Sequence, residues 1–137
     1  MSSIEFNPSL VGIKVVTTYL PSHSRPDDSE YTFAYTITIS NAGDVPVQLL
    51  SRHWIITDAD NEVQEVRGEG VVGEQPVIGP GESFRYTSGA TLTTPVGCME
   101  GSYFMVVREP MEVNPRDLPT FEVPIPAFSL HTPTALH

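Results

Sequence analysis

The sequence is short of cysteine and of basic residues, and both shortages restrict what the protein can be. Its one cysteine, Cys98, has no partner for an internal disulfide and excludes a cysteine-based zinc site. Seven lysines and arginines stand against 17 acidic residues, which gives a formal charge of −10. Such a surface repels phosphate backbones and anionic lipids over a Debye length of about 10 Å. We therefore expect a cytoplasmic protein that binds neither nucleic acid nor membranes.

Long apolar segments are missing as well. The longest apolar run covers 103–107, far short of the ~18 residues of a membrane span. The N-terminus lacks the apolar core of a signal peptide. A chain of 137 residues with 39% hydrophobic content is long enough for one domain with its own core. We expect one soluble domain over 1–137, with 1–9 and 131–137 as candidates for flexible ends, present as a monomer or a weak homodimer.

Helical spacing is also absent, and the periodicity that is present is that of β-strands. Between Tyr31 and Ser40, aromatic and apolar side chains alternate with small or hydroxyl-bearing ones, which predicts a half-buried strand. Turn residues follow at 41–44 and again at 58–61. Further candidate strands cover 11–20, 47–57, 83–92, 99–107 and 121–125. About seven short strands predict an all-β fold, a two-sheet β-sandwich of the immunoglobulin or fibronectin-III type.

The glycine pattern of dinucleotide-binding loops, G-x-G-x-x-G, stands in the middle of the chain. Its members are Gly68, Gly70 and Gly73. In nucleotide-binding folds a helix opens from this loop, and its free amides hold the pyrophosphate. Here Val71 and Val72 are β-branched and Pro76 removes a donor. No helix is expected after the glycines, so the pattern lacks its usual structural context.

Two interpretations of this glycine-rich loop, 68–73, stay open. In the first, successive backbone amides form an anion nest for phosphate or pyrophosphate, and Arg67 adds positive charge. In the second, the glycines permit positive φ angles and close approach where two strands meet. Glu69 and Glu74 flank the loop, and their charges oppose an anion.

Several segments taken together resemble the bacterial ApaG family. They are Phe33-Ala34-Tyr35, Arg52-His53-Trp54, the glycine-rich loop with Gln75-Pro76, Pro80-Gly81-Glu82, Tyr86-Thr87-Ser88-Gly89, Thr94-Pro95, Gly97, Met99, Gly101 and the C-terminal 124–137. The resemblance covers nearly the whole chain and implies the same β-sandwich. It also implies an association with cobalt and magnesium homeostasis, which a domain of this kind could influence only indirectly.

What is known of the family favours binding over catalysis. ApaG-like domains also occur inside larger eukaryotic proteins, among them an F-box substrate adaptor and a polymerase-interacting protein. That usage implies a protein-interaction module rather than an enzyme. Bacterial genes of the family often lie near the hydrolase of diadenosine tetraphosphate, which implies phosphate or nucleotide-polyphosphate sensing as the alternative.

Arg52, His53 and Trp54 are the candidate interaction residues, with Tyr86 expected beside them on an adjacent strand. Arginine and aromatic side chains are the usual anchors of protein interfaces. Trp54 has a second explanation as the tryptophan of the sandwich core, packed against aliphatic side chains. The edge strands and a Pro-rich tail, 119–133, are further candidates for strand addition.

An acidic turn raises the question of a metal site without assigning a ligand. The candidate ligands are Asp58, Asp60, Glu62, Glu65 and His53. Oxygen ligands suit Mg²⁺ or Ca²⁺, but aspartate and asparagine are also the ordinary residues of a hairpin turn. No nucleophile motif such as G-x-S-x-G is present, and Cys98 has Glu100 on the same strand face instead of an activating base. We predict no metal site, no cofactor and no catalytic residue.

Overall fold

The computed structural model describes residues 6–109 and 112–134, which form strands and short 3₁₀ turns. The strands are β1 (Val11–Tyr19), β2 (Tyr31–Asn41), β3 (Val47–Asp58), β4 (Val63–Glu69), β5 (Val77–Ile78), β6 (Ser83–Leu92), β7 (Val96–Val107) and β8 (Phe121–His131). The 3₁₀ turns cover Pro8–Leu10, Pro21–His23, Pro26–Asp28 and Pro115–Asp117. The described residues form no helix that is long and apolar enough to cross a membrane.

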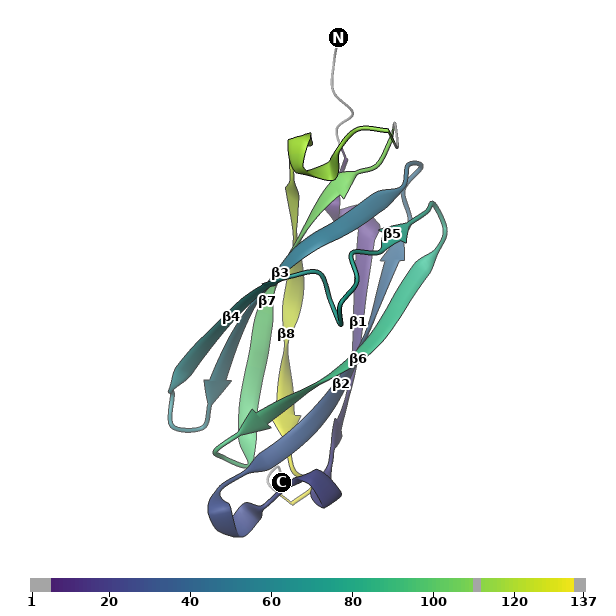
Figure 1. The fold of residues 1–137 in the computed structure, drawn as a ribbon. Coiled ribbons are helices and arrows are strands. Elements are labelled where there is room, and N and C mark those ends of the chain that lie inside the picture. Colours follow the sequence, from purple (N-terminus) through teal and green to yellow (C-terminus); the bar gives the residue numbers. More distant parts are fainter. Residues whose placement is uncertain (1–5, 110–111, 135–137) are drawn as a thin grey trace.

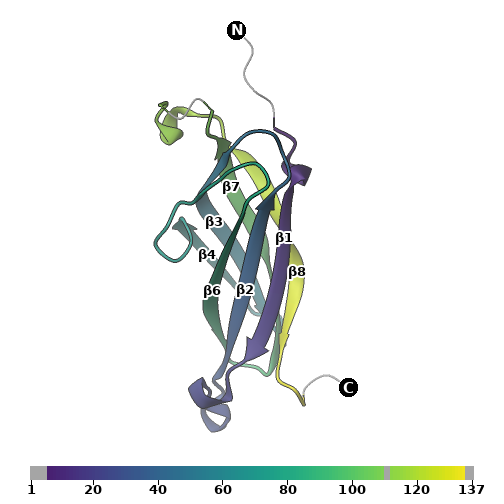
Figure 2. The same ribbon diagram turned by 90° about the vertical axis from the view of Figure 1, so that its right-hand side faces the viewer.

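The strands form two antiparallel sheets packed face to face, so the predicted β-sandwich is confirmed (Figure 1). One sheet has the order β1-β2-β6, and the other has the order β4-β3-β7-β8 with β5 also paired to β3. At one margin of the sandwich β1 lies beside β8, which closes that side (Figure 2). At the opposite margin the sheets end in β4 and β6, and each of these strands is paired on one side only.

The alternation in the sequence places one face of each central strand in the core. In β2, Phe33, Tyr35, Ile37 and Ile39 are buried, while the smaller residues between them face outward. Trp54 in β3 is only 2% exposed. Its predicted place in the core is therefore confirmed.

The surroundings of Trp54 differ from those predicted. Three aromatic rings pack against its indole, those of Tyr35, Tyr103 and Phe128, with centroids 5.5, 6.4 and 5.9 Å away. The rings meet at steep angles, which brings the positive edge of one ring to the negative face of another. The expected aliphatic packing is therefore wrong, because large rings from both sheets fill the centre of the sandwich.

The sequence pattern missed two strands and the length of a third. β4 carries mostly polar and charged residues, because an edge strand open to solvent needs no buried stripe. β5 has only two residues and pairs with the start of β3. β8 continues to His131 and pairs with β7, so most of the Pro-rich tail is part of a sheet. Of the predicted flexible ends 1–9 and 131–137, residues 8–9 lie in the first 3₁₀ turn and His131 ends β8, whereas 1–5 and 135–137 lie outside the described residues.

Candidate binding groove

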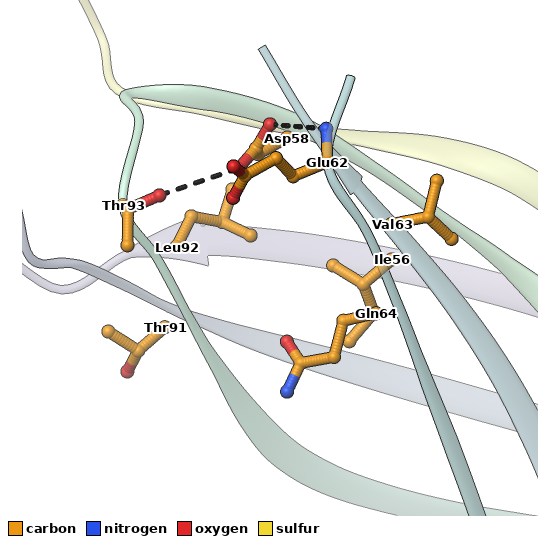
Figure 3. Close-up of a pocket in the computed structure, with 8 residues that line it drawn as sticks. All are labelled: Ile56, Asp58, Glu62, Val63, Gln64, Thr91, Leu92 and Thr93. Carbon is orange, nitrogen blue, oxygen red and sulfur yellow. Dashed lines mark hydrogen bonds between the residues drawn. The ribbon is translucent and has the colours of Figure 1, made fainter. Parts of the chain in front are cut away.

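An elongated groove runs between the two sheets at the open margin, between β4 and β6. Adjoining cavities make up this open-side groove, and neighbouring cavities share lining residues. The middle section has a volume of about 310 Å³, and both sheets contribute to its walls. Its lining includes Tyr35, Trp54, Ile56, Val66, Ser88 and Ala90. One end lies at the turn between β3 and β4 (Figure 3), and the other lies under the glycine-rich loop.

The glycine-rich loop closes its end of the groove and is tied to β3. Where β3 pairs with β7, its register shifts at Leu50, which leaves the Leu50 carbonyl to the loop. That carbonyl accepts from the Gly70 amide at 2.8 Å and from Gln75 Nε2 at 2.9 Å. Val71 is 1% exposed and anchors the loop in the core. Hydrogen bonds and burial together therefore hold the loop in place.

A two-residue turn forms the tip of this loop. Val71 and Glu74 exchange two backbone hydrogen bonds of 2.8 and 2.9 Å. Between them, Val72 and Gly73 have φ angles of 44° and 81°, the combination of a type I′ turn. Glycine adopts this conformation freely, but a β-branched residue does not. Val72 is therefore strained, although its side chain is exposed.

Replacing Val72 with asparagine should stabilise the fold by about 1 kcal/mol. Asparagine tolerates the left-handed region that costs other L-residues about 1–2 kcal/mol. Urea denaturation followed by circular dichroism measures the gain. Val77→Asn is the control, because Val77 is also exposed but lies in the extended backbone of β5. A Val72→Asn variant no more stable than the wild type would contradict the strain at this position.

The hydrogen bonds of the loop also bear on the predicted anion nest. The Gly70 and Val71 amides already donate to backbone carbonyls, so a phosphate would have to displace them. Arg67 is exposed and lies on the outer face of β4, since Val66 beside it points into the groove. The structure thus separates Arg67 from the loop interior by strand alternation.

Two of the glycines instead permit close contacts. A Cβ on Gly68 would lie only 2.7–2.8 Å from the guanidinium of Arg52, and a Cβ on Gly70 would overlap the carbonyl oxygen of Glu74. Arg52 Nη1 donates to the carbonyls of Glu69 at 3.0 Å and Gly70 at 2.8 Å. These contacts support the second interpretation, in which the glycines permit positive φ angles and close approach where two strands meet. The contact of Gly68 with Arg52 was not predicted.

Three of the four predicted interaction residues meet in the groove. Arg52, Trp54 and Tyr86 line the end under the loop, in a cavity of about 260 Å³. Tyr86 reaches it from β6 in the facing sheet, and not from an adjacent strand as predicted. His53 lies on the opposite face of β3, where its Nε2 is 3.8 Å from Glu65 Oε2. Alternation along β3 therefore splits the Arg-His-Trp run between two surfaces.

A buried pair of phenols lies behind this end of the groove. The hydroxyls of Tyr86 and Tyr103 hydrogen-bond to each other. Burial raises the pKa of both hydroxyls well above the usual range, and it outweighs the opposite effect of the Arg52 charge. Both phenols are therefore neutral at physiological pH.

The acidic turn at the other end uses its first carboxylate for the turn itself (Figure 3). Asp58 Oδ1 accepts from the amides of Asp60 at 2.8 Å and Glu62 at 3.0 Å. Asn61 has a φ of 63°, as expected for the left-handed residue of a three-residue hairpin loop. In the part of the chain that the structure describes, no three histidine, cysteine or acidic side chains are grouped to hold a metal.

The sequence did not indicate most of the groove residues. Those missed are Tyr35, Val66, Ser88, Ala90 and Met99. They come from four strands in two sheets, so no local pattern connects them. Tyr35 and Ser88 could have been identified, because each lies in a predicted strand at a position whose side chain points to the inner face. Val66 could not, because the mostly polar sequence of β4 does not alternate and predicts no strand.

The architecture defines an antiparallel two-sheet β-sandwich with one open margin. A family model described as the ApaG domain matches residues 21–107, and the chain belongs to this family. It is 56% identical over 125 residues to Protein ApaG of Ralstonia nicotianae, across 91% of this chain and 94% of that protein. It is 52% identical over 131 residues to Protein ApaG of Dechloromonas aromatica, across 96% and 97% of the two.

A solved structure agrees with this assignment. The crystal structure of a Bordetella pertussis protein described as ApaA matches with a TM-score of 0.82 and 47% identity, across 91% of this chain and 95% of that one. The family resemblance seen in the sequence is therefore confirmed. The family description and the names of these relatives state no enzymatic activity.

Proposed function

We propose that the domain is a protein-binding module whose open-side groove holds an extended segment of a partner protein. The observation that carries this proposal is the position of the groove between two free sheet edges, β4 and β6. An unpaired strand edge offers backbone donors and acceptors to an added strand. β6 pairs with β2 in unbroken register over its whole length, so its free edge is a regular template. A segment paired with β6 directs alternate side chains into the groove.

The lining of the groove suits such a partner. The half-buried Ile56, Val66 and Ala90 contribute apolar surface, while Arg52 and Ser88 contribute polar groups. Apolar surface combined with a few placed polar groups is typical of specific binding sites. Arginine is also among the side chains that contribute most to binding at protein interfaces, and Arg52 is half-buried in this groove.

The titratable groups favour binding over catalysis. Burial and the nearby Glu100 raise the pKa of the Cys98 thiol, so it is protonated at neutral pH and a poor nucleophile. Burial raises the pKa of the Tyr86 and Tyr103 phenols further above neutral pH. A general acid or base works best when its pKa lies near the working pH. On this proposal the domain is not an enzyme, and any effect on cobalt or magnesium homeostasis passes through its partner.

Selection of peptides from a random phage-displayed library on the immobilised domain tests the groove. Enriched peptides should bind the wild type and shift NMR amide signals of β6 and of the groove lining. Ser88→Tyr fills the groove and should weaken their binding about tenfold or more. Thr87→Tyr adds the same side chain to the outer face of the same strand and should leave binding unchanged.

Two outcomes would contradict the groove as the binding site. The first is a set of peptides that bind the Ser88→Tyr and Thr87→Tyr variants equally well. The second is a library that enriches no peptide with shifts along β6. Melting curves of both variants establish that each is folded before binding is compared.

A further inference from the structure

Arg52 places a positive charge inside the open-side groove. Its half-buried side chain lines both the middle section and the end under the glycine-rich loop. No carboxylate of the described residues lies within ion-pair distance of its guanidinium. Glu69 lines the same end, but Arg52 contacts its backbone carbonyl and not its carboxylate. A half-buried cation without a counter-ion in the protein is suited to an anionic ligand.

The hydrogen bonds of Arg52 leave one edge of its guanidinium unused. Nη1 donates to the carbonyls of Glu69 and Gly70, which accounts for both of its protons. Nε and Nη2 donate to none of the described residues. These two nitrogens form a fork whose spacing matches the two oxygens of a carboxylate. The nearly equal distances from a Cβ on Gly68 to Nη1, Cζ and Nη2 place the guanidinium flat over this residue.

Two hydroxyl-bearing residues, Ser88 and the largely buried Tyr86, belong to the lining of the same end of the groove. The Ser88 hydroxyl has no hydrogen-bond partner among the described residues. The phenols of Tyr86 and Tyr103 carry two protons but share one hydrogen bond, so one proton stays available. Tyr86 lines the groove, and the available proton is its own when Tyr103 is the donor. Both groups can therefore donate to an anion that Arg52 holds.

We propose that Arg52, Ser88 and Tyr86 form a carboxylate-binding subsite for an aspartate or glutamate side chain of the bound segment. The subsite belongs to the proposed groove function and rests on it. With a formal charge of −10, the protein repels acidic segments at long range, and Arg52 supplies the local attraction that admits one. Hydrogen bonds between charged partners are stronger in a groove shielded from water than on an open surface. The subsite thus selects segments with a single acidic residue at one position.

NMR on the whole 137-residue protein tests the subsite with small probes. The probes are N-acetylglutamate α-amide, its neutral counterpart N-acetylglutamine amide, and inorganic phosphate. Only the first should give saturable shifts of the Arg52 Nε–H signal and of the Ser88 amide. Equal shifts with the glutamine probe, a response to phosphate alone, or no response to any probe would each overturn the carboxylate subsite.

Matched variants separate the subsite from general charge effects. Arg52→Gln should weaken binding of the glutamate probe about tenfold or more, whereas Arg67→Gln removes a cation from the outer face of β4 and should have no effect. Arg52 also donates hydrogen bonds to the carbonyls of Glu69 and Gly70, so its replacement also removes two contacts of the loop. Ser88→Ala keeps those hydrogen bonds and should lower the affinity for the glutamate probe about fivefold. Wild-type affinity in both Arg52→Gln and Ser88→Ala would overturn the subsite.

Failure of the subsite and failure of the groove are distinguishable. Selected peptides that lack acidic residues, bind along β6 and are unaffected by Arg52→Gln would retain the groove and overturn the subsite. Selected peptides that are unaffected by Ser88→Tyr would overturn the proposed function, even if the glutamate probe still shifted the Arg52 signal.

Discussion

Replacing Gly70 with alanine should lower the free energy of unfolding by about 3 kcal/mol. Gly70 has a φ of 63°, where an L side chain is strained. A Cβ at this position would also overlap the carbonyl oxygen of Glu74. That carbonyl accepts the Val71 amide, so it cannot retreat without breaking the turn. Strain and overlap therefore add at this residue.

Gly73→Ala is the matched control in the same loop. Gly73 has a φ of 81°, but nothing lies within 4 Å of an added Cβ. Only the conformational strain applies, which predicts a loss of about 1 kcal/mol. Urea denaturation of both variants measures the difference. Equal losses would show that the close contact between Gly70 and Glu74 does not contribute to stability.

Alkaline pH should destabilise the protein steeply. Burial raises the pKa of Tyr86 and of Tyr103 in the folded state, whereas in the unfolded chain both ionise near pH 10. Below that pH their contribution to stability is fully present. Above it, the unfolded state loses protons that the folded state keeps, so the free energy of unfolding falls as pH rises. Two such groups predict a loss of about 2.7 kcal/mol per pH unit above about pH 10.

Denaturant titrations between about pH 9 and pH 11.5 measure this slope, because tyrosines of the unfolded chain ionise in this range. Tyr86→Phe removes one of the two titrating groups, so its slope should be about half that of the wild type. The variant also loses the hydrogen bond to Tyr103 and starts from a lower stability. A Tyr86→Phe slope equal to that of the wild type would show that Tyr86 ionises alike in both states.

The central strands could be predicted because one face of each strand packs in the core and the other faces water. The alternation from Tyr31 to Ser40 matches β2 within one residue, and the predicted strand at 83–92 matches β6. β7 begins at Val96, earlier than predicted, because Val96 and Gly97 already pair with β8. The residues before 99 read as a turn in the sequence. The strand nevertheless starts earlier, because its hydrogen-bonding partner β8 extends that far, and β8 is distant in the sequence.

The candidate site could be predicted only in part. The residue types of Arg52, Trp54 and Tyr86 indicated binding, and the structure brings these three together. The chemistry expected of the glycine-rich loop needed free amides, and two of those amides have partners in the loop and in β3. Arg67 was the cation nearest to the glycines in sequence, but strand alternation places Arg52 inside the groove and Arg67 outside.

From its sequence alone, the chain could be assigned as an all-β domain of the ApaG family with an acidic composition and one thiol. Those properties depend on composition, on local alternation and on motifs that are contiguous in the chain. The tertiary structure decided that β4 and β6 stay apart at one margin, that Tyr86 faces Arg52 across a groove, and that the glycines seat an arginine. Each of these depends on which strands pair and which sheet faces which, and contacts between residues distant in sequence leave no local pattern.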